Sequence, residues 1–285
     1  MLAKLPTYRP HREGLRVKKL ITGLITSGLL ALSFVISADE PGMASSVGKQ
    51  MVVGAALSGH EEATSDHTFS ANVLIATEYL YRGITQTNED PTLQGGMDYA
   101  HSSGFYAGTW ASNLEFNPST TDAASLEIDF YAGYGFDFAG LSYDVGYLYY
   151  MYTGQNEDSG GGDYDFWEIY GSISKEFGGS LAPSVSVGFA WSPDFYGEDD
   201  DGIYVNSSIG ISLPAGINPY FNIGYQDVSG DQTTPAGFDY WHYAIGGSKD
   251  FGAFTFDISW NDADNYCSGD QSACEAVVFA VSSAW

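Results

Sequence analysis

The chain has 285 residues, which is enough for one large domain or two small ones. Tyr 21, Phe 17, Trp 6 and Gly 35 favour strands and tight turns over helices. Lys and Arg together number 10 against 36 Asp and Glu, which excludes nucleic acid as a partner, because phosphate binding needs clustered basic side chains.

The N-terminal 44 residues have the layout of a secretory signal peptide. Most of the basic residues precede position 20, and the apolar stretch LITGLITSGLLALSFVIS follows them. Ala38 and Ala44 offer alternative cleavage sites. A transmembrane anchor is the other interpretation, since the stretch nearly reaches bilayer-spanning length. We expect a signal peptide at 1–44, an N-terminal segment at 45–68 and a barrel domain at 69–285.

From position 69 onward, apolar and polar residues alternate with period two, which is the pattern of strands. The clearest run, 124–138, is longer than most strands of soluble sandwiches, and a membrane strand needs about 9–11 residues. Twelve runs show the pattern: 69–83, 91–101, 104–115, 124–138, 140–153, 164–178, 181–192, 202–213, 217–228, 238–250, 252–261 and 275–285. An even number suits a bacterial barrel.

The connections between these runs alternate in length. One set is short (SS, AG, GG, LPAG, FG), and the other is long and acidic, as in TGQNEDSGGGD and PDFYGEDDD. Short turns on one rim and long loops on the other are typical of transmembrane barrels. The sequence therefore predicts an all-β, transmembrane, antiparallel up-and-down β-barrel of about 12 strands, with both termini on the short-turn, periplasmic side.

The last run places Val277, Phe279, Val281 and Trp285 on one face. An alternating apolar strand that ends in an aromatic residue resembles the C-terminal signal by which outer-membrane barrels are recognised. We therefore expect the strand ending at Trp285 to engage the barrel assembly machinery. The expected location is the outer membrane of a Gram-negative bacterium, in contact with its lipid and lipopolysaccharide.

Three short motifs near the start of the predicted barrel are distinctive. They are Tyr-Arg-Gly-Ile-Thr-Gln at 81–86, Gln-Gly-Gly at 94–96 and Gly-Phe-Tyr-Ala-Gly-x-Trp-Ala-Ser-Asn at 104–113. Together they resemble the opening of the TorF family of porins. The resemblance implies an outer-membrane β-barrel with a pore and supplies no catalytic residues. Residues 1–68 depart from the family pattern because the segment before the first strand is long.

Strand parity places eight charged residues on inner faces and makes them candidate pore-lining residues. They are Glu78, Arg82, Asp98, Glu127, Asp129, Asp144, Glu168 and Asp257. An acidic lumen with little base favours cations, as charged rings do in channels. The alternative is that these carboxylates only solvate the lumen.

Arg82 is the only arginine in the predicted strands. Hairpin pairing is expected to bring it near Gln94 or Asp98. Arg82 either orients a solute anion at a constriction or forms a structural ion pair that ties the first hairpin together.

Cys267 and Cys274 flank SGDQSA in the last long loop. Since an exported protein meets oxidising conditions, the pair predicts a disulfide. The acidic loops either bind divalent cations that bridge to lipopolysaccharide or form a solvated surface. No metal-ligand spacing, phosphate loop or nucleophile motif appears. His242 is the only histidine expected within a strand, because His101 is expected at a short turn. We expect no cofactor and no enzymatic activity.

These expectations combine into one function, an outer-membrane porin that forms a passive, cation-preferring channel for small solutes. The alternative is a non-conducting barrel whose acidic loops bind ions or partners.

Overall fold

The computed structural model describes residues 65–115, 124–154, 164–195, 200–229, 238–264 and 275–285. Within these ranges, twelve strands close into one antiparallel barrel, and β2 and β3 form a separate two-stranded hairpin. The barrel strands are β1 (His67–Ala76), β4 (Thr92–His101), β5 (Phe105–Asn113), β6 (Leu126–Phe138), β7 (Leu141–Thr153), β8 (Phe166–Glu176), β9 (Ser184–Ser192), β10 (Gly202–Gly210), β11 (Ile217–Val228), β12 (Phe238–Phe251), β13 (Phe254–Asp264) and β14 (Ala276–Ala284).

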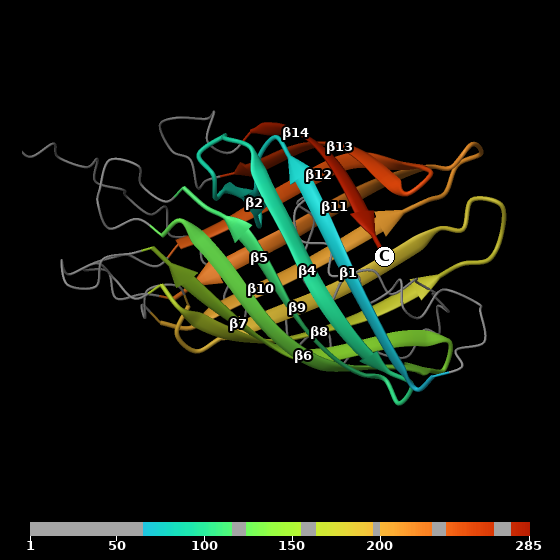
Figure 1. The fold of residues 1–285 in the computed structure, drawn as a ribbon, viewed down its shortest axis with the longest axis horizontal. Helices are drawn as coiled ribbons and strands as arrows, with labels where there is room; N and C mark the ends of the chain where they lie inside the picture. The colour runs from blue at the N-terminus through green and yellow to red at the C-terminus, as the bar shows by residue number, and fades with distance from the viewer. Residues whose placement is uncertain (1–64, 116–123, 155–163, 196–199, 230–237, 265–274) are drawn as a thin grey trace, which may run out of the picture. The chain divides into compact units, whose positions relative to one another are not determined.

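The barrel follows chain order, because each strand pairs with its neighbours along the chain and β14 closes against β1 (Figure 1). At the closure, Asn72 lies opposite Ala284 and Ala76 opposite Ala280. The predicted all-β barrel is therefore confirmed. No helix in the described residues is long and apolar enough to cross a membrane.

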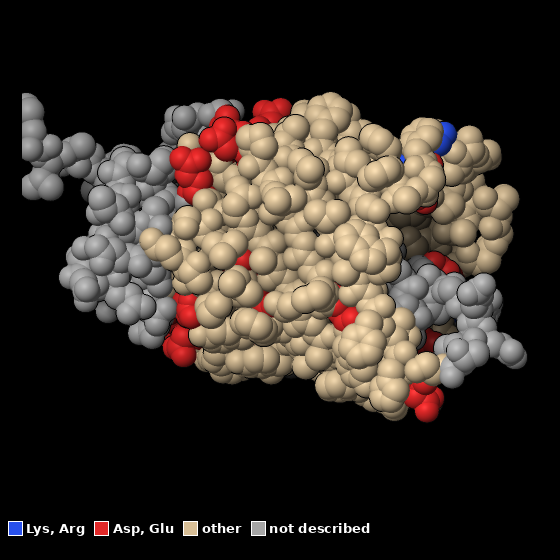
Figure 2. Space-filling model, viewed as in Figure 1, with Lys and Arg blue, Asp and Glu red and all other residues tan. Residues whose placement is uncertain are grey.

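The barrel wall carries apolar side chains outside and polar side chains inside, which is the reverse of a water-soluble protein. On β13, the outward side chains of Phe256, Ile258 and Trp260 are exposed, whereas the inward side chains of Ser259 and Asn261 are buried. The same alternation runs round the barrel, and in Figure 2 the side of the barrel is mostly uncharged while carboxylates gather toward its ends. Apolar groups outside and polar groups inside are what a barrel surrounded by lipid requires.

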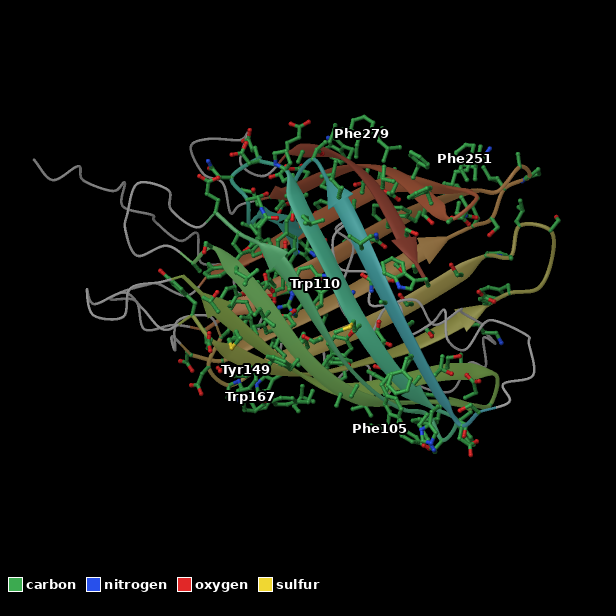
Figure 3. The ribbon with its side chains drawn as sticks, in the orientation of Figure 1. Phe105, Trp110, Tyr149, Trp167, Phe251 and Phe279 are labelled. Atoms are coloured by element: carbon green, nitrogen blue, oxygen red, sulfur yellow. The ribbon has the colours of Figure 1, made fainter. Side chains whose placement is uncertain are left out.

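Aromatic side chains mark both ends of the outer face. Figure 3 shows Tyr149 and Trp167 together toward one end, and Phe105 and Phe251 toward the other. Tyr149 lies directly opposite Trp167 in the β7–β8 register. Two separated aromatic groups on the outer face are typical of the girdles that membrane barrels place at both interfaces.

The short connections gather at one end of the barrel, on the right in Figure 1. They include residues 102–104, 139–140 and 252–253. The connection between β1 and β4 lies at the other end, and the structure describes it completely. It contains β2 (Leu80–Tyr81) and β3 (Ile84–Thr85). The predicted first strand, 69–83, is wrong at its C-terminal end, because β1 stops at Ala76 and the chain then folds into the barrel.

Candidate functional site

Residues 77–91 form what we call the inner hairpin. Leu80 pairs with Thr85 and Tyr81 with Ile84, and Arg82 and Gly83 make the two-residue turn between them. Their φ angles are 48° and 82°, and positive values at both turn positions are the geometry of a type I′ turn. Glycine is required at position 83 for a second reason, because a Cβ atom there would lie 2.7 Å from the Cβ atom of His242 on β12.

Arg82, at the tip of the inner hairpin, is anchored to the opposite wall. Its Nη2 atom lies 2.9 and 2.8 Å from the two carboxylate oxygens of Glu168, and its Nη1 atom donates to Gln226 Oε1 at 2.6 Å. The guanidinium carbon lies 4.1 Å from the ring centre of Tyr204, which adds a cation–π contact. Arg82 and Glu168 are only 2% and 1% exposed, so the pair is sealed from water.

The electrostatics of the hairpin follow from these contacts. Burial acts to lower the pKa of the Arg82 guanidinium, but nearby negative charge, led by Glu168, raises it by more, so Arg82 remains charged. Near the start of the connection, burial raises the pKa of the Glu78 carboxyl, although a hydrogen bond with Thr85 opposes the shift. The hairpin therefore carries one charged guanidinium and one carboxyl whose pKa is raised by burial.

The other side chains of the hairpin reach the remaining sides of the barrel. Tyr79 donates to Glu127 Oε2 on β6 at 3.1 Å and meets the ring of Trp110 on β5 at 5.5 Å; Figure 3 places Trp110 among the side chains of the barrel. Leu80 belongs to an apolar cluster with residues of β1 and β14, and Ile84 packs against a cluster formed by β12 and β13. The inner hairpin thus contacts strands on opposite sides of the barrel.

Toward the short-turn end, tyrosines bridge alternate strands of the wall. In each case a tyrosine crosses a glycine on the neighbouring strand and donates a hydrogen bond to an aspartate one strand further on. The three sets are Tyr131–Gly108–Asp98, Tyr106–Gly133–Asp144 and Tyr220–Gly246–Asp257. Tyr106 Oη lies 2.9 Å from Asp144 Oδ1, and Tyr220 Oη lies 3.1 Å from Asp257 Oδ1. Contacts that skip a strand place these aspartates on the inner face.

The structure brings the eight candidate pore-lining residues into the barrel interior in two groups. Glu78, Arg82, Glu127, Asp129 and Glu168 lie at the level of the inner hairpin and are each at most 7% exposed. Asp98, Asp144 and Asp257 lie toward the short turns, bound by tyrosines. Whether any of them lines a conducting path stays a prediction. Cys267 and Cys274 lie outside the described residues.

The expectation that Arg82 approaches Gln94 or Asp98 is wrong, because Arg82 leaves the wall with the hairpin and crosses to β8 and β11. Tyr79 and Tyr81 also leave the predicted wall strand and lie inside the barrel with the hairpin. The sequence carries one signal for this. Tyr79, Leu80 and Tyr81 are three consecutive large side chains, which breaks the alternation required of a wall strand.

His242 faces the interior, and its Nε2 atom lies 2.8 Å from the hydroxyl of Tyr204, whose ring stacks on the imidazole. It therefore sits in the same contact region as Arg82 and Gly83. Within the described ranges, no three His, Cys, Asp or Glu side chains gather as a metal site would require.

A model of a bacterial protein family described as being of unknown function, Gcw_chp, matches residues 60–285. The chain belongs to the Gcw_chp family. The TorF name suggested by the three motifs is not confirmed by this match. No curated protein matches the sequence of this Gcw_chp member.

The solved structures that this chain resembles include porins. The KdgM porin is 9% identical with a TM-score of 0.50, and the match covers 76% of this chain and 98% of that one. The KdgM porin in complex with disordered oligogalacturonate gives 10% identity, a TM-score of 0.50 and the same coverage. The NanC porin is 8% identical with a TM-score of 0.48, and the match covers 74% of this chain and 97% of that one. At such low identity, the likeness to the KdgM porin shows that the Gcw_chp barrel shares the porin fold.

Proposed function

We propose that this Gcw_chp protein is an outer-membrane channel for small solutes with a preference for cations. The observation that carries the proposal is a closed barrel of porin fold with an apolar outer face and an interior rich in carboxylates. A porin-like barrel needs no catalytic group, and we infer no enzymatic activity. The resemblance of residues 81–113 to TorF porins is consistent with this function.

The charge of the interior supports the preference for cations. The described residues contain three basic side chains, of which Lys175 and Lys249 lie on outward positions of β8 and β12 by strand alternation. Arg82 is therefore the only inward Lys or Arg side chain in this part of the chain, and Glu168 neutralises it. The remaining inner carboxylates attract cations and repel anions.

The location follows from the same surface. The outward apolar band fits lipid, and the last strand presents Val277, Phe279 and Val281 outward before Trp285, as a barrel assembly signal would. We infer export, insertion in a bacterial outer membrane, and contact of the long-loop end with lipopolysaccharide.

The test is the reversal potential of the full chain in a planar bilayer with a KCl gradient. We expect K⁺ to be preferred, and replacement of the tyrosine-bound carboxylates by D98N, D144N and D257N together to move the reversal potential toward zero. D239N is the matched control, because Asp239 lies exposed on the outward side of β12. A chloride preference, or an equal shift in the control, would refute the cation channel.

One observation favours the alternative of a non-conducting barrel, namely that the inner hairpin occupies the interior. Under that alternative, neither the wild-type barrel nor a barrel without the hairpin passes ions. The bilayer measurement on both proteins separates the two functions.

A further inference from the structure

The barrel interior is closed to water at the level of the inner hairpin. Each of the twelve barrel strands contributes at least one inward residue that is no more than 3% exposed. They are Ala76, Gln94, Ser112, Glu127, Tyr150, Glu168, Ser192, Tyr204, Gln226, His242, Asn261 and Val278. A ring of buried and mostly polar side chains inside the barrel means that other groups fill the space between them, and the contacts identify the inner hairpin as part of that filling.

Nearer the short turns, the interior is wetter. Asp144 and Asp257 are partly exposed, as are Ser186 and Ser208, which hydrogen-bond to each other at 2.8 Å. Small and charged side chains there leave access for water. The inner hairpin therefore lies at the level where the barrel interior is least accessible to water.

The hairpin is joined to the barrel in a way that allows it to leave. Its two ends continue into β1 and β4, and these strands pair directly, with Ala76 opposite Thr92. The backbone bonds of the hairpin are largely internal, for example from Gln86 N to Tyr79 O at 2.8 Å. Two backbone bonds leave the hairpin, from Thr77 N to Phe279 O on β14 and from Glu115 N to Gln86 O, both at 2.9 Å. Displacing residues 78–91 breaks only the second of these, so the ladder that closes the barrel stays intact.

The tip of the hairpin carries its buried ion pair, between Arg82 and Glu168. The Arg82–Glu168 pair is buried, and removing one member of a buried pair leaves an uncompensated charge, which is strongly destabilising. Arg82 also has a positive φ, which a residue with a side chain rarely adopts, and its Nε atom has no hydrogen-bond partner in the described structure. The tip is thus held against local strain by the contacts of Arg82 with Glu168, Gln226 and Tyr204.

We propose that the inner hairpin is a gate: residues 77–91 plug the barrel, and the Arg82–Glu168 pair is the latch whose release opens it. The proposal rests on the channel function proposed above. In the closed state the hairpin fills the ring of buried side chains, and in the open state it leaves this ring while the twelve-stranded wall stays intact.

The first test is single-channel recording in planar bilayers of wild type, R82E, E168R, the double variant R82E/E168R, and a chain in which residues 78–89 are replaced by Gly-Ser. Each protein is first shown to be folded by its heat-modifiable migration on gels. We expect the barrel without the hairpin to conduct steadily and wild type to be mostly closed. Either single reversal should raise the open probability at least about tenfold, because like charges then meet in a buried site, and the double variant should restore closure.

The outcomes separate the two proposals. If the folded barrel without the hairpin is silent, the channel function is wrong and the gate with it. If that barrel conducts and wild type shows the same conductance and open probability, only the gate is wrong. Single reversals that behave as wild type would also overturn the latch.

The second test needs no ion current. The bond between Arg82 and Gly83 is a trypsin site. Because Arg82 is buried inside the barrel, trypsin can cut this bond only when the hairpin leaves the barrel. We expect E168Q, which keeps Arg82 but removes its counter-charge, to be cut after Arg82 at least about tenfold faster than wild type. D144N is the control, because it removes a carboxylate of the interior that does not contact the hairpin, and it should stay as resistant as wild type. Equal cleavage of E168Q and D144N would contradict the latch.

Discussion

Gly246 and Gly247 are neighbours on β12 that face opposite sides of the wall, and they provide a matched test of the tyrosine bridges. A Cβ atom at Gly246 would lie 2.8 Å from the backbone oxygen of Ile258 and would overlap the end of the Tyr220 ring. At Gly247, the nearest atom would be the Pro219 Cα at 3.5 Å, which is an ordinary contact. Gly246→Ala therefore has to displace Tyr220, whereas Gly247→Ala displaces nothing.

The magnitude follows from what Tyr220 loses. Its hydroxyl donates to Asp257 at 3.1 Å, and a hydrogen bond to a charged group contributes about 1.5–3 kcal/mol. Crowding against the backbone oxygen adds about 1–3 kcal/mol. The lower backbone entropy of alanine in the unfolded chain returns about 0.4–1 kcal/mol. We expect Gly246→Ala to lower the free energy of unfolding by roughly 2–5 kcal/mol, and Gly247→Ala to leave it unchanged or to raise it by up to about 1 kcal/mol.

The assay is reversible urea unfolding of the barrel from lipid vesicles, followed by tryptophan fluorescence, with gel migration of the folded form as a check. The two variants share the same chemical change and the same strand, so lipid and denaturant effects cancel between them. Free energies of unfolding that agree within about 0.5 kcal/mol, the size of ordinary surface effects, would refute the tyrosine bridges as structural elements.

Three further predictions use the same preparations. Tyr106→Phe should cost about 1–3 kcal/mol in urea unfolding, because Asp144 loses its donor; no loss would contradict the bridge. Phe279→Arg should cost about 2–4 kcal/mol in vesicles if the outer face meets lipid, and a cost near zero would contradict this. Burial raises the pKa of the Glu78 carboxyl when the hairpin is closed. Protonation of Glu78 therefore stabilises the closed hairpin, fully so below the unfolded pKa of 4.5. This stabilisation is lost as the pH rises through the raised pKa of the closed state. The open probability of the channel should therefore fall as the pH drops toward 4.5. The fall should be smaller in Glu78→Gln, which also removes the repulsion between Glu78 and Glu89. Equal pH dependence in the two proteins would contradict this role of Glu78.

The wall could be predicted from the sequence because the alternation of a wall strand has one physical cause. An apolar outer face and a polar interior require period two on every strand, so the strand at 217–228 was predicted and observed with the same limits. Strand ends are less certain, because the alternation continues where a chain leaves the wall. The run predicted at 202–213 shows this, since β10 ends at Gly210.

The inner hairpin could not be predicted in the same way. Its partners are far apart in the sequence, as with Arg82, Glu168 and Gln226, and no local pattern records which inward side chains will meet across a barrel. The tyrosine bridges were missed for a related reason. Glycines such as Gly133 and Gly246 carry no signal of their own in the sequence, and their role appears only when Tyr106 and Tyr220 are seen lying across them.

The position of Arg82 couples opening to ion selection. Because this base sits on the hairpin and not on the wall, its departure would remove the positive charge from the interior and leave Glu168 on β8 without its guanidinium partner. An open barrel would then present the uncompensated Glu168 carboxylate at this level of its interior. We expect the barrel without the hairpin to be strongly cation-selective and Glu168→Gln in that background to reduce the selectivity, measured as the reversal potential in a KCl gradient. If Glu168→Gln had no effect there, ions would not pass the place where the latch had been, and opening and selection would have separate origins.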